Sequence, residues 1–391
     1  MFWGAQPTGG VRRVLMTKRA HLLAAGWRHT LLVPASQGEA QLHCGGVPLP
    51  GSGGYRFVLN RRRAAALMVQ AAPDLIEAAD PYVLGWSALD AARRLGVPAI
   101  AFCHSHLPAL AARLLGGTPR GRRAGLAWRV AQRYLLRLYA HYDLVLAPSR
   151  LLAEQLRGWG LAQAQVQPLG VDCQVFRPEA RDPAWAGQLK KVLALAPDTR
   201  LLLYCGRFAT EKRLPLLARA LDLLGPGHAL LCVGGGPCPP PPGPRLRLLP
   251  PEPDTRRLAL LMASCDAFVH AGDQESFGLS ALEAMACGTP VVLAAQGGLG
   301  ELGSGVGGLV ASAQPAFWAE AMHRALHPDD ADEVQRALRR ARALDWTAVM
   351  AQMMRRYRRL LGAGDGGATP RDQPLSSGRS ASAAAYSFRR L

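Results

Sequence analysis

The sequence predicts an α/β protein built from two doubly wound domains. Strand-like and helix-like segments alternate along most of the 391 residues, which is typical of a parallel sheet covered by helices on both faces. The chain is also too long for one average core, so two domains are expected. A proline-containing break at residues 167–183, QPLGVDCQVFRPEARDP, separates the two alternating stretches and marks the linker.

The first domain is expected to span residues 1–168. Helix-favouring segments occur in this order: 11–26, 61–73, 86–96 and a basic region before 142. Apolar segments that predict strands lie between them, at 28–36, 74–80, 98–103 and 142–149. This alternation predicts a parallel sheet in the first half of the chain.

The second domain is expected to span residues 169–345, because the alternation starts again after the linker. Strands are predicted at 199–205, 228–233, 265–270 and 290–295, and helices at 214–224 and 280–288. A long amphipathic helix follows at 346–361. Residues 362–391 are small and polar, so a disordered tail is expected there.

The composition limits the classes of protein. No apolar run is long enough to span a membrane, and the first ten residues do not resemble a signal peptide. Eight scattered cysteines form no metal-binding pair, which favours a reducing cytoplasm. The net charge of +18 favours anionic partners, although a general bias towards arginine explains it equally well. No aromatic and basic nucleic-acid recognition module is present, so no nucleic-acid partner is expected.

The segment YCGRFATEKR, residues 204–213, carries the first candidate site. Its predicted strand ends at Cys205, Gly206 permits a turn, and Arg207 and Lys212 follow beside the start of a helix. Two cations beside free helix amides are suited to a diphosphate. The alternative is a solvated basic loop.

The segment HAGDQESFGLSALEAMACG, residues 270–288, carries the second candidate site. Glu275 lies in a polar loop just before the free amides of Phe277 to Leu279, and Glu283 lies in a small, apolar helix. Glu275 can cap the helix or accept hydrogen bonds from sugar hydroxyls. Glu283 needs a polar partner, and ribose hydroxyls are suitable.

Two further segments belong to the first domain. His104 follows a predicted strand, with His106 as a competitor two positions later. Gly9 and Gly10 precede the first predicted helix, where backbone can approach phosphate or sugar. A lone histidine and a Gly-Gly pair are weak signals individually.

Taken together, these motifs resemble the retaining glycosyltransferases of family 4, which have the GT-B fold and an E-x7-E motif. The resemblance covers roughly residues 9–361 and rests on the order of GG, FCHSHLP, PLGVDCQVFRP, GRFATEK, VGGGP, the two glutamates and GGLGEL. The closest likeness is to bacterial GDP-mannose-dependent α-mannosyltransferases. It implies two Rossmann-like domains facing a central cleft, with helix 346–361 crossing back toward the first domain.

The resemblance also implies a role for each motif. The residues near the reacting groups would be His104, Arg207, Lys212 and Glu275. Those that bind the donor would be Gly9, Gly10, Gly206, Gly235, Ser276, Phe277, Gly278, Leu279 and Glu283. Neither a metal ion nor another cofactor is implied, since Arg207 and Lys212 would neutralise the diphosphate.

The expected activity is transfer of a hexose, mannose first, from a nucleoside-diphosphate sugar to a lipid-linked or saccharide acceptor with retention of configuration. The alternatives are a UDP-sugar-dependent glucosyl- or sulfoquinovosyltransferase and a catalytically impaired sugar-nucleotide-binding homologue. A cytoplasmic protein is expected, peripheral on the inner face of the membrane if a basic helix binds anionic lipid. In that helix Arg129, Arg133 and Arg137 share one face, and Leu126, Val130, Tyr134 and Leu138 are expected on another. The alternative is an ordinary helix that packs its apolar stripe on the sheet.

One feature departs from the family pattern. Only Met1, Phe2 and Trp3 precede the short glycine loop, where the family has an apolar strand in the middle of the first sheet. A missing central strand would leave backbone groups of its neighbours without partners. The expectation is therefore a misassigned start or an impaired chain.

Overall fold

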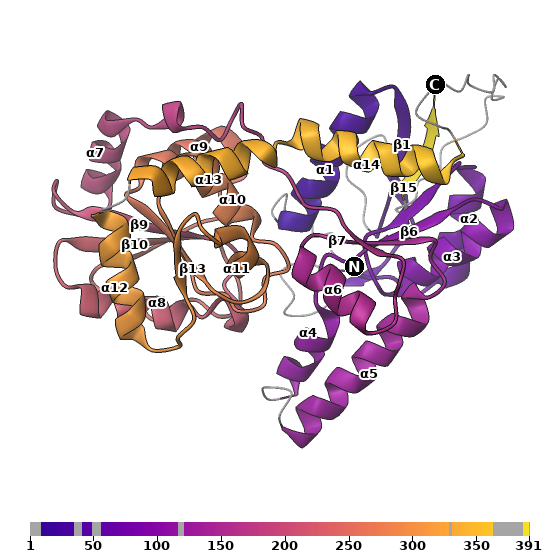
Figure 1. Ribbon diagram of the computed structural model, residues 1–391, viewed down its shortest axis with the longest axis horizontal. Coiled ribbons are helices and arrows are strands. Elements are labelled where there is room, and N and C mark those ends of the chain that lie inside the picture. The colour runs from indigo at the N-terminus through magenta and orange to yellow at the C-terminus, as the bar shows by residue number, and fades with distance from the viewer. Residues whose placement is uncertain are drawn as a thin grey trace. The chain divides into compact units, whose positions relative to one another are not determined.

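The computed structural model describes residues 9–34, 41–48, 56–115, 121–327, 331–362 and 386–390 (Figure 1). The chain divides into two compact units: unit 1 comprises Met1–Gln167 and Met350–Leu391, and unit 2 comprises Pro168–Val349. The first division falls one residue before the predicted domain boundary. The second falls inside the last long helix, most of which belongs to unit 1.

Unit 1 contains a seven-stranded sheet whose strands are short and mostly buried. Its helices are α1 (Gly10–Ala24), α2 (Arg61–Gln70), α3 (Val83–Leu95), α4 (Leu107–Leu114), α5 (Arg122–Tyr139), α6 (Arg150–Gly158) and most of α14 (Trp346–Leu360). Its strands are β1 (Trp27–Val33), β2 (Gln41–His43), β3 (Val47–Pro48), β4 (Arg56–Phe57), β5 (Ile76–Ala78), β6 (Ala99–Phe102), β7 (Leu144–Ala147), β8 (Ala164–Val166) and β15 (Tyr386–Arg390).

The centre of this sheet is occupied by the C-terminal strand. The order is β2-β1-β15-β5-β6-β7-β8, and β15 runs antiparallel to both neighbours while the other strand pairs are parallel. Thr30 of β1 pairs with Ser387, which in turn pairs with Ile76 of β5. The backbone of β15 thus supplies hydrogen-bond partners to both β1 and β5.

The predicted disorder of the tail is wrong for Tyr386–Arg390, which form β15. Aromatic residues favour strands, but pairing with β1 and β5 depends on contacts across hundreds of positions that local composition does not report. Residues 1–8, 363–385 and 391 lie outside the described residues, so the expectations for the N-terminal segment and the rest of the tail fall there.

Unit 2 contains a six-stranded sheet in which every pair is parallel, in the order β11-β10-β9-β12-β13-β14. Its strands are β9 (Arg200–Cys205), β10 (His228–Val233), β11 (Leu246–Leu249), β12 (Ala267–His270), β13 (Val291–Ala294) and β14 (Gly308–Val310). Its helices are α7 (Pro183–Val192), α8 (Leu214–Leu224), α9 (Thr255–Ser264), α10 (Leu279–Ala286), α11 (Gly297–Gly303), α12 (Pro315–Leu326) and α13 (Ala331–Ala343), with short 3-10 turns η1 (Pro178–Ala180) and η2 (Thr210–Lys212).

Burial of the central strands explains why they read as continuous apolar runs. Every residue of β12 and β13 is buried, as is every residue of β6 and β7 in unit 1. Helices therefore cover both faces of each sheet, as the alternation of the sequence predicted. In unit 2 the carboxyl ends of β9, β10 and β12 lead directly into the motif loops.

A buried polar cluster fastens α1 and α14 to the sheet of unit 1. The ammonium of Lys18 lies 2.5 Å from Oε1 of Glu77, and Tyr357 donates to Oε2 of the same carboxylate at 2.6 Å. Each of the three residues is at most 1% exposed. Glu77 thus joins the first helix of the unit, β5 and the last long helix.

No helix among the described residues is long and apolar enough to cross a membrane.

Candidate functional site

Two glycine-containing loops meet at the carboxyl ends of β9 and β10. The amide of Gly206 donates to the carbonyl of Val233 at 3.0 Å, and the amide of Phe208 donates to the carbonyl of Gly235 at 2.8 Å. Gly234 has a φ of 147°, and a Cβ there would lie 1.9 Å from the carbonyl oxygen of Gly206. The close backbone contact therefore requires glycine at this position, and it brings the predicted residues Gly206 and Gly235 together.

Arg207 lies at the surface of this loop. Its guanidinium donates to Glu211 at 2.7 Å, while the carbonyl of Arg207 accepts from the buried Tyr204 hydroxyl at 2.9 Å. The side chain is 48% exposed. A guanidinium has five N–H donors, so the contact with Glu211 leaves donors available to a phosphate.

Lys212 and Glu275 form an ion pair between the η2 turn and the loop after β12. Their side chains are 14% and 19% exposed, so solvent and ligands can reach the pair. His270, the last residue of β12, places Nε2 3.3 Å from the same Oε1 of Glu275. Nδ1 of His270 accepts from the amide of Gly272 at 3.1 Å, so the imidazole N–H faces Glu275.

The surroundings of Glu275 keep its carboxylate ionised. Burial acts to raise the pKa of Glu275, but the charge of Lys212 and hydrogen bonds from His270 and Lys212 outweigh it and lower the pKa well below its usual value. An ionised carboxylate accepts hydrogen bonds and donates none. Glu275 is therefore suited to hold hydroxyl groups.

Helix α10 begins directly after this carboxylate. Gly278 is its N-cap, with a φ of 103° and no side-chain capping bond, so Leu279 begins a helix with uncapped amides. The loop is held from behind by α11: the amide of Gly298 donates to the carbonyl of Glu275 at 2.7 Å, and a Cβ on Gly278 would lie 2.5 Å from Leu299. Ser276 is half-buried and Phe277 is buried in this turn.

Glu283 lies on α10 and is 3% exposed, among the buried residues Ala281, Leu282, Ala284, Met285 and Ala286. Burial raises the pKa of the Cys287 thiol, and the charge of Glu283 raises it further, which places the carboxylate beside that thiol. The sequence-based expectation of a carboxylate in an apolar setting is confirmed. Such a group needs polar partners.

Gly9, Gly10 and His104 belong to unit 1. Gly9 is the N-cap of α1 with a φ of 125°, which favours glycine, whereas Gly10 is the first helical residue and a Cβ there would meet open space.

The two histidines after β6 have different environments. His106 caps α4, since its Nδ1 accepts from the amide of Ala109 at 3.1 Å, and its Nε2 lies 2.7 Å from Gln155. His104 stacks on Phe102 with ring centroids 4.2 Å apart. Burial and the charge of Lys18 lower the pKa of His104 to about 3, so this imidazole is neutral at neutral pH. His106 thus has a structural role, and His104 is left as the candidate.

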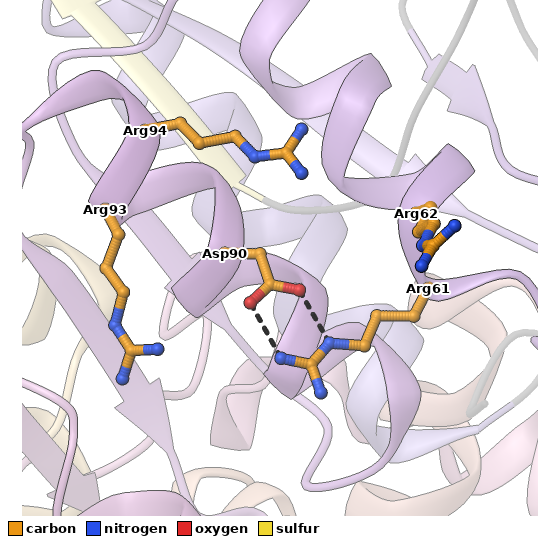
Figure 2. Close-up of a pocket in the computed structure, with 5 residues that line it drawn as sticks. All are labelled: Arg61, Arg62, Asp90, Arg93 and Arg94. Carbon is orange, nitrogen blue, oxygen red and sulfur yellow. Dashed lines mark hydrogen bonds and ion pairs between the residues drawn. The ribbon is translucent and has the colours of Figure 1, made fainter.

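A separate hollow of about 490 Å³ lies between α2 and α3 of unit 1 (Figure 2). It is lined by Arg61, Arg62, Asp90, Arg93 and Arg94, and Figure 2 shows the fork of Arg61 on the carboxylate of Asp90, with distances of 2.6 and 2.7 Å. None of these residues was predicted to belong to the site. In the described part of the chain, no group of His, Cys, Asp and Glu side chains has the arrangement of a metal site.

Sequence reasoning missed His270 and Glu211. Both are local: His270 ends the strand that leads to Glu275, and Glu211 lies four positions after Arg207. The strand end at His270 was visible in the sequence, but its hydrogen bond to a residue five positions later was not.

The fold of the chain is that of the GT-B glycosyltransferases. Sucrose-phosphate synthase from Thermosynechococcus elongatus superposes with a TM-score of 0.72 at 23% identity, covering 92% of this chain and 96% of that one. This likeness and the two-unit α/β architecture give the fold class of the chain.

Family models give the particular class. The model described as Glycosyltransferase Family 4 matches residues 8–175, and the one described as Glycosyl transferases group 1 matches residues 199–328. The chain belongs to the family 4-like glycosyltransferases and is a hexosyltransferase, which confirms the resemblance noted in the sequence.

Two curated relatives have names that state different transferred groups. A GDP-mannose-dependent α-(1-6)-phosphatidylinositol dimannoside mannosyltransferase of Mycobacterium tuberculosis is 29% identical over 383 residues, which covers 90% of this chain and 93% of the relative. Sulfoquinovosyl transferase SQD2 of Arabidopsis thaliana is 30% identical over 239 residues, which covers 59% of this chain and 44% of that protein.

Proposed function

We propose that the protein transfers mannose from GDP-mannose to a lipid-linked or saccharide acceptor, with retention of configuration. The observation that carries this proposal is the accessible cluster of Lys212, Glu275 and His270 beside the uncapped start of α10. Likeness over nearly the full length to a GDP-mannose-dependent enzyme supports the choice of donor.

The donor diphosphate would bind at Lys212 and Arg207. An ammonium has three N–H donors, so Lys212 can keep its bond to Glu275 and still donate to phosphate oxygens. Arg207 offers the remaining donors of its fork, and the amides at the start of α10 favour negative charge. Gly206 and Gly235 let the backbone approach the phosphates.

Glu275 would hold the hydroxyls of the transferred sugar, with Ser276, Phe277, Gly278 and Leu279 forming the turn around it. Glu283 would accept hydrogen bonds from the ribose hydroxyls, because an ionised carboxylate can accept from two hydroxyl groups. In unit 1, Gly9 and Gly10 would approach the phosphates, and neutral His104 would contact the sugar near the reacting carbon.

In the reaction, the bond between the anomeric carbon and the diphosphate oxygen breaks, and a bond from that carbon to the acceptor oxygen forms on the same face. The leaving phosphate takes the acceptor proton. Lys212 and Arg207 would stabilise the charge that develops on the phosphate, so no metal ion is needed in this proposal.

A second candidate is transfer of glucose or sulfoquinovose from a uridine nucleotide. The likeness of 239 residues to the plant sulfoquinovosyl transferase favours it over other donors. The same loop chemistry would serve both, since base recognition is separate from the diphosphate and sugar contacts.

The test is release of nucleoside diphosphate from GDP-mannose, UDP-glucose and UDP-sulfoquinovose by the full chain, with and without chelator. The expected result is fastest turnover of GDP-mannose, unchanged by the chelator. Faster turnover of a uridine donor would replace the mannose assignment, and loss of activity on chelation that magnesium or manganese restores would contradict the metal-free reaction. Binding of nucleotide without turnover of any donor would indicate an impaired homologue.

A further inference from the structure

The exposed face of α5 carries both cations and aliphatic side chains. The helix has 18 residues, five of them arginine and none acidic. Its exposed positions are Arg122, Arg123, Leu126, Arg129, Val130, Arg133 and Arg137. Leu126 is 57% exposed and Val130 is 59% exposed.

This arrangement corrects the sequence-based expectation for the helix. Leu126 and Val130 were expected on a face apart from the arginines, but they lie among them. The sheet side of α5 is made by other residues instead: Ala124, Ala131, Leu135, Leu138 and Tyr139 are buried. Of the four residues expected in the apolar stripe, Leu138 is fully buried. Tyr134 is half-buried and bonded to Trp86.

The geometry of an ideal helix shows how close the two kinds of side chain lie. At 100° per residue, Leu126 falls about 20° from Arg133 and from Arg137, and Val130 about 20° from Arg123 and from Arg137. The helix is about 27 Å long at 1.5 Å per residue. It therefore presents one arc in which aliphatic groups are flanked by guanidinium groups along several turns.

More aliphatic surface lies at the end of the neighbouring helix α4. Leu114 is 75% exposed and Leu115 is 57% exposed, and α4 packs against α5. Figure 1 shows α4 and the N-terminal half of α5 extending away from the sheet of unit 1. A flat surface could meet this projecting end without approaching the sheet.

The arginines of α5 have no carboxylate partner among the described residues, and no acidic residue of the helix itself can supply one. They are thus available to an external anion. We propose that the projecting end of α4 and the exposed arc of α5 dock on a bilayer that carries anionic lipids, with Leu114, Leu115, Leu126 and Val130 entering the interface. The inference goes beyond the proposed reaction and would place a lipid-linked acceptor beside unit 1.

A bilayer fits this surface better than a nucleic acid does. Surfaces that bind single strands stack bases on aromatic rings, and the exposed arc of α5 has no aromatic residue. The tryptophan of the helix, Trp128, is half-buried and packs on His106 and Trp159. Exposed aliphatic side chains between cations are what the headgroup and acyl boundary accommodates.

The test is co-sedimentation of the full chain with vesicles of phosphatidylcholine alone and with 30% phosphatidylglycerol, at low and high salt. We expect binding to the anionic vesicles only, weakened by salt. Each surface arginine contributes roughly a fivefold change in affinity, so Arg129→Gln with Arg133→Gln should weaken binding about 25-fold. The matched control is Arg93→Gln with Arg94→Gln, which removes the same charge from exposed positions of α3 in the same unit.

A second variant separates insertion from charge. Leu126→Ser with Val130→Ser leaves the charge unchanged and should reduce vesicle binding at least tenfold. Both side chains are more than half exposed, so the substitutions should leave the fold intact. Equal binding by this variant, equal losses in the α3 control, or binding to a single-stranded RNA without binding to vesicles would each overturn the proposal. Binding of GDP and UDP to the same preparations reports on the donor site separately, so failure here is distinguishable from failure of the proposed reaction.

Discussion

Among the described residues, each unit has one ion pair between a lysine and a glutamate, and the two pairs differ in burial. Lys18 and Glu77 of unit 1 have side chains that are 2% and 0% exposed, and Tyr357 completes the cluster. Lys212 and Glu275 of unit 2 are 14% and 19% exposed, and His270 is their third member. The chain has only four lysines, so half of them are in these pairs.

The difference in burial indicates different roles for the two ion pairs. A sealed pair cannot be reached by a ligand, and removal of one partner leaves a charge in a low-dielectric interior. A partly exposed pair also stabilises the fold, but its remaining donors and acceptors can serve a ligand. We therefore expect mutations in the first pair to affect folding and mutations in the second to affect turnover.

The largest effect is expected for Glu77→Ala. Loss of the carboxylate leaves Lys18 buried without its anion and Tyr357 without its acceptor, which should cost about 3–5 kcal/mol of folding free energy. Urea unfolding followed by circular dichroism measures it. The control is Asp90→Ala, which removes the partly exposed partner of Arg61 in the same unit and should cost at most about 1 kcal/mol. An equal loss of unfolding free energy in the two variants would show that the buried Glu77 cluster stabilises the fold no more than a partly exposed ion pair does.

Lys212→Ala should affect turnover more than stability. Turnover should fall roughly a hundredfold, because the charge that develops on the leaving diphosphate loses a cation. The loss of stability should be smaller than in Glu77→Ala, because the Lys212–Glu275 pair is partly open to solvent. Lys191→Ala is the matched control, an exposed lysine of the same unit outside the site. Wild-type turnover in Lys212→Ala would remove the lysine from the proposed reaction, and Arg207→Ala tests the second cation in the same assay.

Mild acid should destabilise unit 1 before it destabilises unit 2. Burial lowers the pKa of His104 to about 3, and burial with the charges of Lys18 and Arg19 lowers the pKa of His29 well below its usual value. Both pKa values are depressed in the folded state, so this contribution to stability is complete above about pH 6.5 and is lost as the pH falls below it. Between pH 6.5 and 5, His104 should remove about 2 kcal/mol from the stability of unit 1, and His29 should add to this loss.

The carboxylate of Glu275 also has a depressed pKa, so its contribution in unit 2 is kept until the pH falls below the ordinary range of a glutamate. Thermal unfolding at pH 7 and pH 5, followed by hydrogen exchange in each unit, should show unit 1 losing protection first. The variant His29→Phe should lessen the loss. Simultaneous loss of protection in both units would contradict the assignment.

Glu283 sharpens the comparison because it is nearly as buried as Glu77 yet is assigned to a ligand. Glu283→Ala should weaken binding of GDP by an amount on the order of 1–3 kcal/mol, the usual loss for a hydrogen bond to a charged group. Calorimetry with GDP measures it. Unchanged affinity in a folded variant would assign Glu283 to the fold, as Glu77 is.

The sequence predicted unit 2 better than unit 1, for a physical reason. In an all-parallel sheet the motifs follow consecutive strand ends, so Gly206, Lys212 and Glu275 could be placed near one another from their positions alone. In unit 1 the central strand comes from Tyr386–Arg390, far along the chain from its partners. No local pattern reports such a pairing.

The same limit applies to single side chains. Lys18 and Glu77 are 59 positions apart, so neither drew attention in the sequence. On α5 the helical period fixes the relative angles of the residues. The neighbouring elements decide which face of the helix is covered, and Leu126 and Val130 lie outside that face. Contacts between distant segments are thus what sequence reasoning lacked in both cases.

The smallest effect is expected at His270, which acts through Glu275 and is therefore a positioning residue. Its Nε2–H orients the carboxylate while its Nδ1 accepts from the amide of Gly272, so the loop and the carboxylate are held by one ring. His270→Ala should lower kcat about fivefold, the equivalent of one hydrogen bond of about 1 kcal/mol. The affinity for GDP should not change, since the sugar rather than the diphosphate lies against Glu275 in the proposed reaction. His270→Gln keeps an N–H donor and should restore part of kcat, whereas a purely structural role would lower nucleotide affinity and kcat together in both variants.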